Sequence, residues 1–236
     1  MKRFDAYLFY ILSVGLIYLG MFGAPSFHLP KHKTKAHTTV TSELLTSHVI
    51  LYLDKDGDVK GSCTGTAIGP NAILTAEHCN LAQESKMVSF DLATEHHEIV
   101  AVTYDNHDHM IELFTGSPFT NIEPVRQASA ALGDRVTMYG FGGHKYPADP
   151  RYGKVVACDD YSDMDAAAGE QCYSLRVIPG DSGSAVFNTK GEIVGILTYR
   201  NDDDPIILSI GFVLNFGTGV LDTARTFRPG TLGELK

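Results

Sequence analysis

The chain has 236 residues, of which 44% are hydrophobic and 20% charged, as in an ordinary folded protein rather than a disordered one. Its formal net charge of −9 argues against a nucleic-acid-binding surface, which is usually basic. Tryptophan is absent, glycine is frequent at 23 residues, and β-branched runs outnumber helical periodicities. This mixture predicts an all-β fold with many tight turns.

The first 24 residues are typical of a targeting segment. Lys2 and Arg3 precede an uncharged apolar stretch from residue 6 to residue 22. Because basic residues stay on the cytoplasmic side, everything after this stretch is expected to be exported. We expect a hydrophobic helix that acts as an uncleaved signal anchor, with a removed signal peptide as the alternative. The protein would then be membrane-anchored or secreted.

A polar segment follows at residues 25–44. It is basic, contains proline and shows no apolar period, so it predicts a flexible linker. Its three histidines, His28, His32 and His37, are interpreted as solvated side chains rather than as metal ligands.

The chain contains four cysteines: Cys63, Cys79, Cys158 and Cys172. An even number in an exported protein predicts disulfides, and three pairings are possible. No Cys-x-x-Cys spacing occurs, so a zinc site of the usual kind is not expected.

From His48 onward, short apolar runs alternate with turn-rich gaps, which predicts about a dozen strands and hardly a helix. The first run, residues 48–54, is followed by Asp56-Gly57, a hairpin turn signal, and by a second run at 61–69. Many short strands at this spacing predict a sandwich or a barrel. The other predicted strands lie at residues 72–79, 87–92, 98–104, 110–114, 134–141, 153–158, 173–178, 184–187, 192–199 and around 208–216.

Two short segments, residues 75–79 (TAEHC) and 180–183 (GDSG), carry residues suited to nucleophilic catalysis. A serine hydroxyl is a weak nucleophile unless a base takes its proton, and the tetrahedral intermediate needs donors for its oxyanion. Glycines on both sides of Ser182 permit a tight turn, in which the N–H groups of Gly180 and Ser182 would form an oxyanion hole. A turn that merely joins two strands is the alternative.

These segments resemble the signatures of the chymotrypsin-like (trypsin-like) serine proteases. TAEHC resembles the family's Thr-Ala-Ala-His-Cys, GDSG matches its nucleophile loop, and the order His, Asp, Ser is also the family's. Further likeness lies at residues 133–136 (GDRV), 193–196 (IVGI) and 209–213 (SIGFV), the last resembling bacterial periplasmic proteases of the high-temperature-requirement type.

The resemblance covers about residues 47–216 and implies two packed six-stranded antiparallel β-barrels. It implies a polypeptide substrate and no metal or organic cofactor. The chain resembles the compact bacterial or viral members of the family, which have no peptide-binding domain. The expected organisation is a targeting segment (1–24), a linker (25–44), an N-terminal barrel (45–122), a C-terminal barrel (123–225) and a tail (226–236).

The resemblance also implies a catalytic triad of His78, Asp108 and Ser182. Asp108 would hold His78 in the right tautomer, so that His78 can accept the proton of Ser182. Residues 108–111 (DHMI) depart from the family's Asp-Ile-Ala-Leu, and Asp105 is the alternative acid. A metal cluster of His107, Asp108 and His109 is the rival interpretation of this segment.

A substrate pocket is expected around residues that flank the serine loop. Arg176 lies six positions before Ser182, where the family often has the base of the pocket. Arg176 and Arg200, two arginines near this pocket, would favour an acidic substrate side chain. Strand alternation that turns Arg176 toward solvent is the alternative. The other walls would come from Thr198, Tyr199, Arg200 and Gly211.

Two further features follow from the resemblance. Cys79 resembles the family cysteine that bridges back to the preceding strand, where Cys63 lies, and Cys158–Cys172 is the remaining pair.

Digestive members pair a newly freed amine with the aspartate before the serine, here Asp181. No Ile-Val-Gly-Gly sequence precedes His48, so the chain is expected to fold directly into an active form. An inactive homologue that acts as an anchored binding module is the competing function.

Overall fold

The computed structural model describes residues 46–80, 87–91, 93–123, 125, 128–142, 149–158, 170–200, 209–212 and 216–230. The predicted N-terminal helix, the linker and residues 231–236 of the predicted tail lie outside these ranges. Within them, no helix has the length and apolar character needed to cross a membrane.

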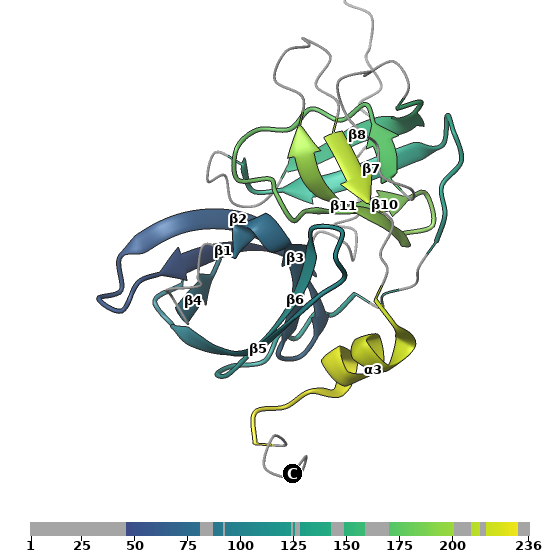
Figure 1. Ribbon diagram of the computed structural model, residues 1–236. Helices are drawn as coiled ribbons and strands as arrows, with labels where there is room; N and C mark the ends of the chain where they lie inside the picture. Colours follow the sequence, from purple (N-terminus) through teal and green to yellow (C-terminus); the bar gives the residue numbers. More distant parts are fainter. Residues whose placement is uncertain are drawn as a thin grey trace, which may run out of the picture. The chain divides into compact units, whose positions relative to one another are not determined.

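The first barrel is a closed antiparallel sheet with the strand order β1-β2-β3-β6-β5-β4. It closes because β4 pairs back with β1, and Figure 1 shows its strands as a ring. Alternate side chains point inward, where Ile50, Ile73 and Phe114 are among the buried residues. Its strands are β1 (Ser47–Leu53), β2 (Val59–Gly69), β3 (Ala72–Ala76), β4 (Met87–Phe90), β5 (His97–Tyr104) and β6 (His109–Phe114).

The second barrel has the strand order β10-β11-β12-β9-β8-β7 and closes through the pairing of β7 with β10. Its shortest seam joins β8 to β9 through the pairs Val155–Tyr173 and Val156–Cys172. Its strands are β7 (Arg135–Gly140), β8 (Asp149–Val156), β9 (Glu170–Tyr173), β10 (Ala185–Asn188), β11 (Ile193–Arg200) and β12 (Ser209–Phe212).

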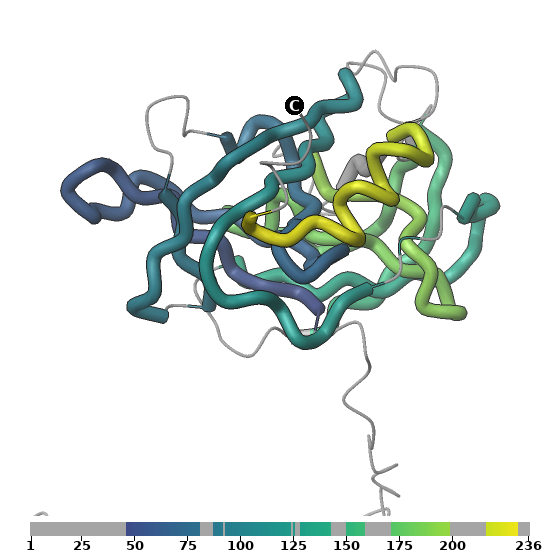
Figure 2. The backbone as a smooth tube through the Cα atoms, turned by 90° about the horizontal axis from the view of Figure 1, so that it is seen from below, coloured from purple at the N-terminus to yellow at the C-terminus, as the bar shows by residue number. Residues whose placement is uncertain are grey.

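The predicted all-β fold is confirmed, with local differences. Residues 77–79, predicted as the end of a strand, form a short 3-10 helix. Residues 174–178, predicted as part of a strand, have no regular secondary structure. A helix that was not predicted, α3 (Thr218–Thr226), packs on β2 and is drawn in yellow in Figure 2. Gly69 of β2 lies so close to α3 that an added Cβ would collide with the carbonyl of Ala224.

One hydrophobic cluster is shared between the two barrels. Leu74 of the first barrel and Phe187 and Ile196 of the second belong to it, together with Ala224 of α3. Burying these apolar side chains stabilises the association of the two sheets. The loops that carry the candidate site are therefore held on a common core.

Candidate active site

His78 lies in a short 3-10 helix, η1 (Glu77–Cys79), directly after β3. The N–H of Asn80 donates to the carbonyl of Glu77 (2.8 Å), which closes this turn. Cys79 is buried and is bonded to Cys63 of β2. The imidazole of His78 is thus carried on a segment that is anchored immediately before and after it.

Asp108 contacts His78 through both carboxylate oxygens. Its Oδ1 accepts from the backbone N–H of His78 (2.8 Å), and its Oδ2 lies 2.7 Å from Nδ1 of the ring. The carbonyl of Asp108 also accepts from the N–H of Glu77 (2.8 Å). Because a carboxylate can only accept, Nδ1 carries a proton, and in the neutral imidazole Nε2 is then left with a lone pair. This is the tautomer that a general base requires.

Asp105, the alternative acid, pairs with a different histidine. Its Oδ2 lies 2.6 Å from Nδ1 of His109, and both side chains are fully buried. Asp108 is therefore the carboxylate that contacts His78. In the part of the chain that the structure describes, no group of three or more His, Cys, Asp or Glu side chains could hold a metal ion.

Ser182 lies in the loop before β10, and this loop is docked on the first barrel. The carbonyl of Ser182 accepts from the N–H of Thr64 (2.8 Å), and the carbonyl of Gly180 accepts from the Thr64 hydroxyl (2.9 Å). Gly183 has φ +84°, and a Cβ there would meet Thr75 and the backbone N of Ala76. The serine loop thus contacts the end of β3, two residues before His78.

The two predicted oxyanion donors are Gly180 and Ser182. Gly180 adopts φ +96°, a left-handed conformation that glycine reaches at little cost. Within the described ranges, no residue accepts a hydrogen bond from the N–H of either Gly180 or Ser182. Neither N–H therefore has to break a bond to a described group before it donates to a ligand oxygen.

Asp181, between these donors, is buried and ion-paired. Its Oδ1 accepts from the N–H of Gly142 (2.7 Å) and its Oδ2 from the N–H of Ile178 (2.7 Å). Arg151 of β8 donates from Nη1 to the same Oδ2 and to the carbonyl of Arg176 (3.2 Å). Sequence reasoning missed Arg151, because no motif surrounds it and only the pairing of β8 with β7 brings it to this loop.

The structure contains both expected disulfides, the one that the resemblance implied and the one left as the remaining pair. Cys63–Cys79 joins β2 to η1, and Cys158–Cys172 joins the residues after β8 to β9. The first bond lies beside the histidine segment, whereas the second lies in the second barrel. No described cysteine is left as a free thiol.

The residues predicted to form a substrate pocket are only partly described. Thr198 is buried in β11, and Gly211 lies opposite Leu197 in the pairing of β12 with β11. Arg176 is exposed between buried Leu175 and Val177, as in the alternative that turns it toward solvent. The side chains of Tyr199 and Arg200 lie outside the described part, and the acidic preference stays a prediction.

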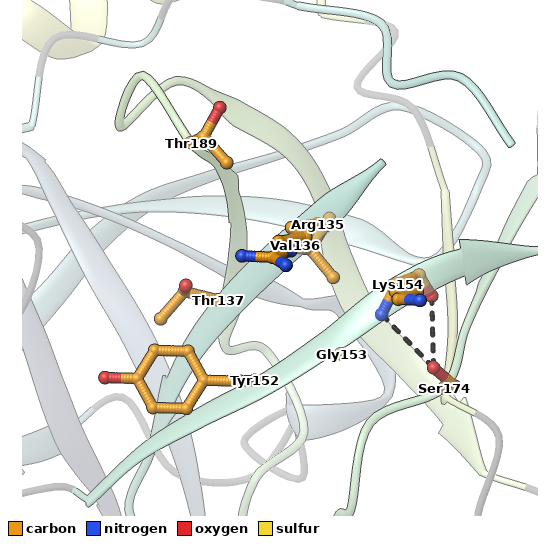
Figure 3. Close-up of a pocket in the computed structure, with 8 residues that line it drawn as sticks. All are labelled: Arg135, Val136, Thr137, Tyr152, Gly153, Lys154, Ser174 and Thr189. Carbon is orange, nitrogen blue, oxygen red and sulfur yellow. Dashed lines mark hydrogen bonds between the residues drawn. The ribbon is translucent and has the colours of Figure 1, made fainter. Parts of the chain in front are cut away.

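A groove of about 720 Å³ lies elsewhere on the second barrel (Figure 3). Its floor is the outer face of β7 and β8, and none of the predicted site residues lines it. Tyr152 is 65% exposed there, beside the cations Arg135 and Lys154. The residues that line it are Arg135, Val136, Thr137, Tyr152, Gly153, Lys154, Ser174 and Thr189.

A family model matches more than half of the chain. Residues 63–196 match the trypsin-like peptidase domain, and the match includes His78, Asp108 and Ser182. The chain belongs to the trypsin-like peptidase family. Among curated protein sequences, none matches it.

This trypsin-like peptidase is also similar in fold to solved bacterial proteases. The Rv3671c protease of M. tuberculosis in an inactive form has a TM-score of 0.54 at 19% identity, covering 78% of this chain and 88% of its own. A serine-to-alanine mutant of it, also in an inactive form, gives 0.56 at 17%, with 73% and 82% covered. A serine endoprotease of Yersinia pestis gives 0.58 at 14%, with 79% and 67% covered.

The family indicates the class of substrate, and the disulfides indicate the cellular compartment. A peptidase domain acts on polypeptides. Disulfides persist in oxidising surroundings and are rare in the cytosol of most cells, so the two bonds indicate that this trypsin-like peptidase works outside the cytoplasm.

Proposed function

We propose that this trypsin-like peptidase is a serine endopeptidase with His78, Asp108 and Ser182 as its triad. The observation that carries the proposal is the double contact of the Asp108 carboxylate with the N–H and Nδ1 of His78, 2.8 and 2.7 Å. It supports an imidazole that is oriented as a base. The docking of the Ser182 loop on Thr64 and beside Ala76 supports a nucleophile at the same place.

The reaction would proceed through an acyl-enzyme. Ser182 Oγ attacks the scissile carbonyl carbon while Nε2 of His78 takes the hydroxyl proton, and Asp108 stabilises the imidazolium. The N–H groups of Gly180 and Ser182 donate to the oxyanion. The proton passes from His78 to the leaving amine as the C–N bond breaks. His78 then deprotonates water, which attacks the ester, and His78 returns this proton to Ser182 Oγ as the carboxylic acid product leaves.

The ion pair of Asp181 with Arg151 supports an active form that needs no activating cut. Asp181 obtains a cation from within its own barrel, and Gly142 and Ile178 satisfy its remaining acceptor sites. A freed terminal amine is not required to neutralise this carboxylate. We propose further that residues 1–24 direct export and either anchor the protein or are removed.

A fluorophosphonate probe, which reacts with an activated serine, tests the triad. Full-length protein is expected to be labelled, and Ser182→Ala is expected to abolish labelling. Asp108→Asn should slow it by roughly 10⁴-fold, because His78 would be held in the wrong tautomer. The control is Ser174→Ala, which replaces a serine in the groove on the outer face of β7 and β8 and should label as the wild type does.

Folded wild-type protein that is not labelled would contradict the proposal and favour the inactive binding module. Folding is checked by circular dichroism and by a cooperative thermal transition. Labelling that persists in Ser182→Ala would assign the nucleophile to another residue.

A further inference from the structure

The turn that carries Asp108 has an unusual backbone. Asn106 has φ +64° and Asp108 has φ +62°, so two residues that are not glycine adopt the left-handed conformation within three positions. Asn and Asp adopt this conformation more readily than other L-residues, but it still costs more for them than for glycine. Bonds from neighbouring groups therefore help to hold residues 105–109 in this shape.

Asp105 makes the bonds that hold this turn. Its Oδ1 accepts from the N–H groups of His107 (2.9 Å) and His109 (3.2 Å), and its own N–H donates to the His109 carbonyl (3.3 Å). Its Oδ2 lies 2.6 Å from Nδ1 of His109, with both side chains fully buried. One buried carboxylate thus closes the turn at its backbone and at a side chain.

The same turn is joined to the histidine segment. His109 opens β6 and lies opposite Ala76, the last residue of β3. Asp108, just before it, accepts from the N–H groups of Glu77 and His78. His109 therefore fixes the position of Asp108 on one side, and the Asp108 carboxylate contacts His78 on the other side.

We propose that Asp105 and His109 form a positioning pair, which sets the conformation of Asp108 and through it the orientation of His78. The inference rests on the proposed function, since Asp108 must matter for catalysis if its position is to matter. Because the side chains of Asp105 and His109 are fully buried, they would act through Asp108 rather than by contact with a substrate.

A matched control exists in the same barrel. His48 and Asp91 form another His–Asp pair, with Nδ1 2.6 Å from Oδ2, and Asp91 has φ +54°. Asp91 also accepts from a backbone N–H, that of Val49 (3.2 Å). No hydrogen bond within the described ranges links this pair to Glu77, His78 or Asp108. It has the same side-chain pairing as the positioning pair without its connection to the triad, and its side chains are 13% and 26% exposed.

The test is a double-mutant cycle on the labelling rate and on kcat and KM for a peptide substrate. Asp105→Ala is expected to lower kcat by about 10- to 100-fold with KM nearly unchanged, because a misplaced catalytic group loses rate rather than binding. In an Asp108→Ala background the same change should cost less than about twofold, since the residue it acts through is gone. Equal losses in both backgrounds would overturn the proposal. Asp91→Ala should keep kcat within about threefold of wild type.

Amide hydrogen exchange supplies a readout that does not depend on activity. In Asp105→Ala, the N–H groups of Glu77 and His78 should exchange at least about tenfold faster, while that of Leu51 in β1 is unchanged. Asp91→Ala should leave Glu77 and His78 as in the wild type. Unchanged exchange at both positions in Asp105→Ala would overturn the proposal, whatever the labelling shows. Absence of labelling in the wild type would instead remove the proposed function.

Asp105→Asn covers the case in which the alanine variant does not fold. Asparagine keeps an oxygen that can accept from His107 and His109, but it removes the negative charge that faces the His109 ring. The expected result is a smaller loss of kcat and a smaller acceleration of exchange at Glu77 and His78. Wild-type values for both would overturn the proposal.

Discussion

Asp181 is a buried acidic residue that needs an opposite charge and hydrogen-bond donors around it. It lies between the two proposed oxyanion donors, its side chain has no exposed surface, and its negative charge would be costly if it were unpaired. Arg151, whose side chain is 17% exposed, supplies the opposite charge, and two backbone N–H groups complete the acceptor sites. The shape of the serine loop therefore depends on a residue 30 positions away in the sequence.

Replacement of Arg151 by methionine tests this dependence. Arg151→Met leaves the buried carboxylate without its cation, and breaking a buried pair in this way costs about 3–5 kcal/mol. The free energy of unfolding measured in urea should fall by that amount. Labelling of Ser182 should slow by more than about tenfold, because the loop is no longer held.

The control for this prediction is Arg135→Met, which removes an exposed arginine from the outer face of the same barrel (Figure 3). It should change the unfolding free energy by no more than about 0.5 kcal/mol and leave labelling unchanged. Equal effects of Arg135→Met and Arg151→Met would show that the loss of an arginine as such matters, not the pairing with Asp181.

At the scale of an element, η1 has few internal bonds of its own. It has three residues and no side-chain cap. Its position is determined by Asp108 and by the Cys63–Cys79 disulfide, which connects it to β2. A single turn between a strand and a loop thus depends on bonds to other elements to present His78.

Removal of the two disulfides separately tests this role. Cys63→Ala/Cys79→Ala opens a loop with a sequence separation of 16, which should lower the unfolding free energy by about 3 kcal/mol. It should also slow labelling by more than about tenfold at temperatures where the protein stays folded. Cys158→Ala/Cys172→Ala, with a separation of 14, should lose similar stability but keep labelling within about threefold. Equal losses of labelling would contradict the role of the first bond.

At the scale of the whole molecule, the two barrels and α3 share one apolar core. Leu74, Phe187 and Ala224 come from three parts of the chain and lie in the same cluster. A carboxyl group is also buried inside the first barrel. Glu112 of β6 has no exposed surface, and the hydroxyl of Tyr52 donates to its Oε1 (3.2 Å).

Burial raises the pKa of Glu112 from its usual 4.5 to about 8, although the bond from Tyr52 opposes the shift. Between these values the folded state keeps a proton that the unfolded chain releases. The contribution of Glu112 to stability is thus fully present below about pH 4.5 and is lost as the pH rises to about 8.

Glu112→Gln keeps a neutral polar group and removes this titration. The unfolding free energy of the wild type, relative to the variant, should therefore fall by on the order of 1 kcal/mol per pH unit between pH 5 and 8. Urea denaturation at several pH values measures this difference. Parallel curves for the two proteins would contradict it, and Glu98→Gln on the exposed face of β5 is the control.

Much of the fold follows from local pattern. Runs such as residues 48–54 and 61–69 alternate around Asp56-Gly57, and they form the β1–β2 hairpin with Gly57 at φ +85°. The pattern failed at residues 174–178, where Leu175 and Val177 are buried without strand pairing. It also missed α3, although Val220, Leu221 and Ala224 recur at helical spacing and pack against the core.

The sequence by itself determined the family, the candidate histidine and serine, and the all-β class, because these depend on contiguous motifs and on the two-residue period of strands. It left Asp105 and Asp108 as rivals, since both precede the same strand. Only the tertiary structure paired Asp108 with His78, Asp105 with His109 and Arg151 with Asp181. Hydrogen bonds of this kind depend on where strands and loops meet in space, which residue order along one segment does not encode.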